Sequence, residues 1–162
     1  PASANTPPDT PLVLTSVSIA DADAGSASLE VSLAATNGAL TLAATTGLTF
    51  SAGTGTADAA MTFTGNLTDI NAALNGLTFT PSAAYTGAAT IQIDVDDQGN
   101  TGPGGAQTDT ATIAISVATP SGGGDGDDDE GCSTVPALGL AVPFALALLL
   151  FVALRRRHDA TA

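Results

Sequence analysis

Residues 90–96 read TIQIDVD, and in this stretch the apolar residues Ile91, Ile93 and Val95 alternate with polar ones. Alternation with a period of two is typical of a β-strand that buries one face and exposes the other. The same pattern returns in short runs bounded by Gly, Asn, Asp or Pro: SLEVSLA at 28–34, ALTLA at 39–43, GLTFS at 47–51, AMTFTG at 60–65, GLTFTP at 76–81 and TIAISVA at 112–118.

These runs predict about seven or eight strands in about 110 residues, which favours an all-β antiparallel sandwich of immunoglobulin-like architecture. One segment, NLTDINAALNG at 66–76, interrupts the strand pattern. We expect Thr68 to cap a short helix over 69–75 and Gly76 to end it. The helix would cross from one sheet to the other and bury three apolar residues on one side: Ile70, Ala73 and Leu74.

The charge of the chain excludes several classes of function. The 162 residues include 16 acidic and three basic ones, which gives a net charge of −13. Lys is absent and the basic residues are consecutive, Arg155, Arg156 and Arg157. Nucleic-acid binding is not expected, because phosphate contacts need Lys or Arg. With one Cys and one His, the main body cannot assemble an internal disulfide, a Cys-rich zinc site or a Ser-His-Asp site. We therefore expect a binding or structural module and no enzyme.

The C-terminal part divides by composition. Residues 135–154 are twenty uncharged residues, VPALGLAVPFALALLLFVAL. As a helix they would rise about 30 Å, the thickness of the hydrocarbon core of a bilayer. The arginines that follow predict a cytoplasmic end, with the body outside. The alternative is a helix buried within a hairpin. The expected layout is a polar linker or truncated strand at 1–8, a sandwich at 9–119, a flexible Gly/Asp-rich tether at 120–132, a transmembrane helix at 133–154 and a basic tail at 155–162.

Residues 122–157 resemble the CTERM sorting signals of bacteria. The acidic Gly-rich linker is followed by Gly131 and Cys132, the apolar segment and the arginine cluster. The layout with a Cys is similar to the MYXO-CTERM type, and the GlyGly-CTERM type is close to it. The resemblance implies cleavage by a membrane sorting protease near Cys132 and transfer of the body to the outer surface. This copy has one Cys where some members carry a pair, and the alternative is a thiol without a role.

Residues 9–117 resemble a tandem repeat of large bacterial surface adhesins. The resemblance rests on DTPLVLTSVSIADADAG, on TNGALTLAATTGLTF and above all on TGNLTDINAALNGLTFTP. It implies a cadherin-like or Ig-like sandwich, neighbouring repeats in a longer parent chain, and calcium between successive repeats. A full repeat opens with a further strand before Asp9. Residues 1–8, PASANTPP, are expected to be too polar and proline-rich to supply it.

Two acidic clusters are candidate calcium ligands, ADADAG at 20–25 and DVDDQGN at 94–100. Carboxylate and amide oxygens are the ligands that Ca²⁺ prefers. Asp9 aligns with an acidic position of the resembling repeats and is added to the set. The alternative is ordinary surface charge, as in a salt-adapted protein. The candidate ligands are Asp9, Asp21, Asp23, Asp94, Asp96, Asp97 and Asn100.

The sequence as a whole predicts a membrane-proximal structural and adhesive module of a bacterial cell-surface protein. Its expected partners are the membrane, neighbouring repeats and a sorting protease. The alternative is an accessory binding module of a surface-anchored or secreted hydrolase. A carbohydrate site usually presents exposed aromatic side chains, and Tyr85 is the one residue that the body offers for this.

Overall fold

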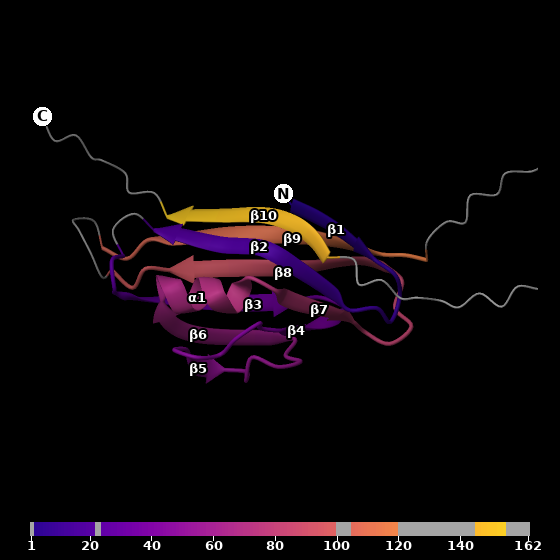
Figure 1. The fold of residues 1–162 in the computed structure, drawn as a ribbon, viewed down its shortest axis with the longest axis horizontal. Coiled ribbons are helices and arrows are strands. Elements are labelled where there is room, and N and C mark those ends of the chain that lie inside the picture. The colour runs from indigo at the N-terminus through magenta and orange to yellow at the C-terminus, as the bar shows by residue number, and fades with distance from the viewer. Residues whose placement is uncertain (1, 22–23, 100–104, 120–144, 155–162) are drawn as a thin grey trace, which may run out of the picture.

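The computed structural model describes residues 2–21, 24–99, 105–119 and 145–154 (Figure 1). These residues form ten strands in two sheets and one helix. The six-stranded sheet contains, in spatial order, β1 (Ala2–Thr6), β9 (Thr108–Val117), β8 (Gly87–Asp96), β3 (Ser28–Ala35), β6 (Ala60–Asn66) and β5 (Thr49–Ala52). The four-stranded sheet contains β10 (Ala145–Leu154), β2 (Leu12–Asp21), β7 (Leu77–Pro81) and β4 (Gly38–Thr41).

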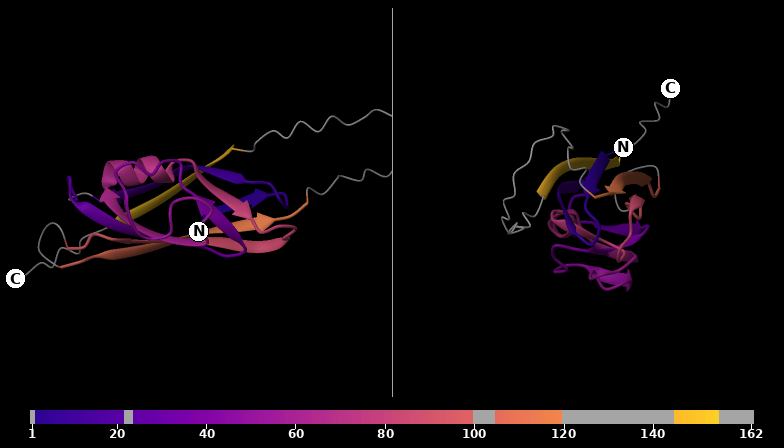
Figure 2. Two further views of the ribbon diagram at one scale, coloured as in Figure 1. Left: turned by 90° about the horizontal axis from the view of Figure 1, so that it is seen from below. Right: turned by 90° about the vertical axis from the view of Figure 1, so that its right-hand side faces the viewer.

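The two sheets enclose one hydrophobic core. All seven runs predicted as strands contribute a strand, β3 to β9. In β8 the alternation is confirmed, because Ile91, Ile93 and Val95 are fully buried between antiparallel neighbours β3 and β9. Side chains from the second sheet, such as Leu14 and Phe79, complete the same cluster. The views in Figure 2 show the resulting layers, which confirm the predicted all-β sandwich.

Helix α1 (Leu67–Leu74) links β6 of one sheet to β7 of the other, as expected. Its cap differs from the prediction: Asn66 is the N-cap in place of Thr68, and its Oδ1 accepts from the backbone N–H of Asp69 at 2.9 Å. Asn caps a helix at least as well as Thr, so a start two residues earlier is favoured. The chain leaves the helix through Gly76, whose φ of +104° suits glycine. The buried face is the predicted one: Ile70, Ala73 and Leu74.

The first strand corrects the expectation for residues 1–8. β1 runs parallel to β9, from Ala2 opposite Ile113 to Thr6 opposite Val117. An edge strand needs few inward side chains, and Ala4 and Thr6 are only 3 % and 4 % exposed. Pro7 and Pro8 follow the strand, where their missing N–H removes no pairing. The expectation that this segment is too polar and proline-rich to supply a strand is therefore wrong, and the sandwich begins before Asp9.

The structure describes ten residues of the C-terminal apolar segment, and the membrane helix expected at 133–154 stays a prediction. Residues 145–154, predicted as the second half of a helix, form strand β10, which pairs in parallel with β2. The physical reason is that the outer edge of β2 offers backbone groups that an extended segment can pair with. Within the described residues, no helix has the length and apolar character that crossing a membrane requires. The predicted tether, the basic tail, residues 133–144 and the processing residues Gly131, Cys132, Arg155, Arg156 and Arg157 lie outside the described part.

Candidate functional site

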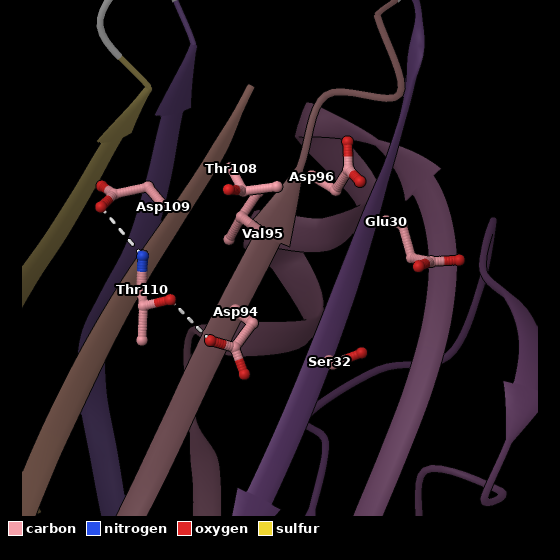
Figure 3. A pocket seen from close by; sticks show the side chains of 8 residues that line it. All are labelled: Glu30, Ser32, Asp94, Val95, Asp96, Thr108, Asp109 and Thr110. Atoms are coloured by element: carbon pink, nitrogen blue, oxygen red, sulfur yellow. Dashed lines mark hydrogen bonds between the residues drawn. The ribbon is translucent and has the colours of Figure 1, made fainter. Parts of the chain in front are cut away.

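A hollow of about 320 Å³ lies over the solvent face of the six-stranded sheet where β8 ends (Figure 3). It is built from β3, β8 and β9, which run side by side there. The lining is mostly acidic and hydroxylic, and it contains no base. Its residues are Glu30, Ser32, Asp94, Val95, Asp96, Thr108, Asp109 and Thr110.

The strand register sets which acids face one another. Glu30 of β3 lies directly opposite Asp96 of β8, and both are half-buried. Like charges directly opposite in a sheet are destabilising. Asp109 pairs with the inward-facing Val95, so it belongs to the other face of the sheet. The solvent face of the hollow therefore carries three carboxylates, those of Glu30, Asp94 and Asp96.

Hydrogen bonds hold the outer acids in place. Asp94 Oδ1 accepts from Thr110 Oγ1 at 2.7 Å, and Asp94 Oδ2 accepts from Gln92 Nε2 at 2.8 Å (Figure 3 shows the first bond). Asp96 Oδ1 accepts from the N–H of Gln98 at 2.7 Å, just past the end of β8. These carboxylates are thus fixed by neutral donors of the same sheet and its adjoining loop.

The carboxylate of Asp97 is buried and accepts hydrogen bonds from the backbone. Asp97 is only 5 % exposed, and its Oδ1 accepts from the N–H of Gly99 at 2.8 Å and of Gln107 at 2.7 Å. The backbone N–H of Asp97 in turn donates to the carbonyl of Gln107. One carboxylate therefore joins the two ends of the connection between β8 and β9. A buried carboxylate needs such donors, because desolvation without them is costly.

The structure separates the predicted calcium ligands. Asp9 Oδ1 accepts from the N–H of Ala84, in the loop before β8. Strand β8 is ten residues long, which is about 30 Å, so Asp9 lies at the opposite end of the sandwich from Asp96. The expectation that Asp9 joins this cluster is wrong. Asp21 ends β2 at the same end of the sandwich as the end of β8 (Figure 1). Asp23 and Asn100 lie outside the described residues.

In the described residues no three His, Cys, Asp or Glu side chains are grouped so that they could hold a metal ion. Calcium binding therefore stays a prediction, which rests on the resemblance and on the acids at the β2 and β8 ends. A shared site would need oxygen ligands from a neighbouring repeat as well.

The carboxylate of Asp58 fixes a tight loop at 54–58. From the sequence alone, Asp58 is expected to be a capping or surface residue. Its Oδ2 accepts from the backbone N–H groups of Thr54 at 2.9 Å, Gly55 at 2.8 Å and Thr56 at 3.1 Å. These bonds, led by that from Thr54, lower the pKa of the Asp58 carboxyl from its usual 3.8. The signal was present in the spacing TGTAD, in which an Asp follows small turn-forming residues.

Tyr85 is a structural residue. Its hydroxyl donates to the carbonyl of Ala88 at 2.6 Å and accepts from Asn37 Nδ2 at 2.9 Å. The ring packs against the hydrophobic core and is half-buried. The one aromatic side chain considered for carbohydrate contact thus has its polar atom and part of its ring engaged within the sandwich.

Two asparagine side chains that the sequence pattern does not indicate form hydrogen bonds to the backbone of β2 in the four-stranded sheet. Asn71 of α1 accepts from the N–H of Ile19 at 2.7 Å and donates to the carbonyl of Ile19 at 3.0 Å. Asn75 accepts from the N–H of Ser16 at 3.2 Å. The side-chain amides therefore act in the place of a neighbouring strand. Their spacing of four residues, on one side of a short helix, is the signal that could have found them.

No protein-family model, curated protein or solved structure matches this chain. In the described part of the chain, the side chains available for chemistry are carboxylates, hydroxyls, amides and one phenol.

Proposed function

We propose that this chain is a membrane-proximal structural and adhesive module of a bacterial cell-surface protein. Its body is a cadherin-like or Ig-like sandwich that spaces more distal parts of a parent chain from the envelope. The C-terminal apolar segment and the three arginines anchor it, with the body outside. The resemblance to adhesin repeats and to CTERM sorting signals supports this assignment.

The observation that carries the proposal is the direction of the two strands at the ends of the body. β1 and β9 are parallel neighbours, and the chain leaves the sandwich at Val117, opposite the end of β1. Tension between the start of β1 and the exit from β9 pulls the two strands past one another. All hydrogen bonds of the β1–β9 ladder are then strained together and must break together. This arrangement suits a spacer that transmits tension lengthwise.

The charge distribution agrees with an extracellular, envelope-attached body. All ten acids before residue 120 lack a basic counterpart in the same stretch, so neighbouring modules of this kind would repel one another sideways. Such repulsion keeps an array extended. Calcium belongs to the proposal as the ion that would neutralise the acids at the β2 and β8 ends and stiffen the joint to a neighbouring repeat.

Vesicle flotation of the full chain tests the anchor. The chain is mixed with vesicles of phosphatidylethanolamine and phosphatidylglycerol and centrifuged through a density gradient. We expect it to float, and to lose this property in the variant Leu148→Asp/Leu149→Asp, because charges within the apolar part of a membrane helix are costly. The control variant Leu148→Ala/Leu149→Ala should still float. A chain that stays at the bottom of the gradient contradicts the proposed anchor.

A further inference from the structure

The outer edge of β2, along which β10 pairs, supports an inference that goes beyond the proposed function. We propose that this edge is a docking site for residues 145–154 of the same chain, which it holds as strand β10 whenever the segment is not in a membrane. The inference has two halves. The membrane half, insertion of the segment into a bilayer, rests on the proposed function. The docking half, pairing of the segment with β2, rests on the fold alone.

β2 uses its two edges differently. Along one edge, Leu12, Val13 and Leu14 pair with β7, and the amides of Asn71 and Asn75 cover the continuation. Along the other edge, β10 pairs in parallel from Ala145 opposite Val13 to Leu154 opposite Asp21, with a register shift after Ala147. β10 thus follows nearly the whole length of β2.

The position of β10 closes one side of the sandwich. It lies next to β1 and β9 of the other sheet as well as beside β2, as the end-on view of Figure 2 shows. Without it, β2 would be the edge strand of its sheet, ten residues long and rich in apolar residues. Long apolar edges of this kind pair with other chains, and proteins normally cover them. The segment therefore protects an edge that would otherwise promote aggregation.

The sequence of the segment fits a strand as well as it fits a membrane. Residues 145–154, ALALLLFVAL, contain no proline, whereas the preceding residues include Pro136 and Pro143. The backbone N–H groups of the segment are thus all available for pairing, and the strand begins two residues after the second proline. The 27 residues between β9 and β10, 118–144, can span up to about 90 Å, about three times the length of a ten-residue strand.

Docking on β2 and insertion in a bilayer exclude each other. A membrane helix satisfies its backbone groups within itself, whereas β10 satisfies them through β2. The same ten residues cannot do both. The edge of β2 therefore competes with the membrane for the segment, and keeps it paired until lipid is available.

Disulfide trapping in the full chain tests both halves. In a Cys132→Ser background, the pair Ser18→Cys/Phe151→Cys places two thiols at opposite positions of the register. Neighbouring strands bring Cα atoms within the range that a disulfide spans. The pair Thr15→Cys/Ala147→Cys repeats the test elsewhere on the ladder. The pair Ser18→Cys/Ala145→Cys is the matched control, because Ala145 lies opposite Val13.

In lipid-free buffer we expect both in-register pairs to form a disulfide within one chain, and the control pair to remain largely reduced. Adding phosphatidylethanolamine/phosphatidylglycerol vesicles before oxidation should remove most of the crosslink. Equal crosslinking of in-register and control pairs, or crosslinks only between two chains, overturns the docking half. A crosslink that persists in chains that float with vesicles overturns the competition. Crosslinking without flotation overturns the proposed anchor and leaves the docking site standing.

Discussion

β8 and β2 are both ten-residue strands, but they are held in different ways. β8 lies between two antiparallel strands, and its own alternation of buried and exposed residues determines its register. β2 is paired at one edge by a short strand and by helix side chains, and at the other by a distant apolar segment. The position of β8 is thus specified by its own sequence, whereas that of β2 depends on elements elsewhere in the chain. Both strands bury apolar side chains in the core, so the stability of β8 should depend mainly on this burial, whereas that of β2 should depend in addition on individual polar contacts.

The largest expected effect comes from the inner face of β8. Ile93→Ala removes a fully buried side chain, so the free energy of unfolding should fall by about 3 kcal/mol. The matched control is Gln92→Ala, one residue away on the exposed face, which should change it by less than about 0.5 kcal/mol. Urea denaturation followed by circular dichroism measures both. Equal effects of the two substitutions would show that β8 is not held by its inner face.

The next largest effect on stability is expected from the polar contacts of β2. Asn71→Ala leaves both backbone groups of Ile19 without their partner, which should cost about 2 kcal/mol. Asn75→Ala removes one longer bond to an exposed N–H and should cost about 0.5 kcal/mol. Hydrogen exchange of the Ile19 amide provides a local readout, which should accelerate in the first variant only. Unchanged protection at Ile19 would contradict the strand-like role of Asn71.

The connection between β8 and β9 should be sensitive to Asp97. Asp97→Ala removes the acceptor of two backbone N–H groups and is expected to cost about 1 to 2 kcal/mol. Asp97→Asn keeps an oxygen acceptor and should recover a large part of this loss. The thermal midpoints of the three proteins in EDTA give the comparison without any bound ion. Equal losses for Ala and Asn would contradict a role as acceptor.

Asp58 should make a small, pH-dependent contribution. Its carboxyl has a lowered pKa in the folded protein, so the carboxylate stabilises the fold above the unfolded value of 3.8. This stabilisation is lost as the pH falls through the folded pKa. Asp58→Asn should therefore be less stable than the wild type at pH 7, and the difference should shrink below about pH 4. Denaturation midpoints from pH 7 to pH 2.5 measure it, and a difference that grows on acidification contradicts the assignment.

The smallest effect has the opposite sign. Asp96→Asn relieves the repulsion from Glu30 directly opposite, while it keeps an oxygen for the N–H of Gln98. Stability should rise by about 0.5 kcal/mol at low ionic strength, and the gain should fade in 1 M salt. Glu30→Gln serves as the reciprocal variant. A gain that is independent of salt would point away from charge repulsion.

Most of the fold could be predicted from the sequence because β3 to β9 each carry their own alternation. β2 carries it too, but Ser16, with a φ of +71°, interrupts the pattern and obscures it. For β1 the sequence leaves a polar linker and a truncated strand open, because a parallel edge strand needs so few apolar residues. β10 could not be told from a membrane helix, since a uniformly apolar run fits both and its pairing partner lies more than a hundred residues away.

The candidate site was predictable in part. The alternation around Val95 puts Asp94 and Asp96 on one face of β8, and Asp97 follows the last residue of the strand. Burial of Asp97, and the location of Asp9 at the far end, depend on contacts with Gln107 and Ala84 that no local pattern encodes. Whether calcium binds the acids at the β2 and β8 ends is tested by the thermal midpoint in Ca²⁺ against EDTA, with Mg²⁺ as the control.

Single-molecule pulling tests whether the body transmits tension along the parallel β1–β9 pair. With attachment points at Ser3 and Ala118, force strains the whole ladder at once, whereas attachment at Pro8 and Ala118 peels it from one end. We expect a clearly higher unfolding force for the first geometry at the same pulling speed. Equal forces in the two geometries, or a higher force on peeling, would contradict a spacer built on this strand pair.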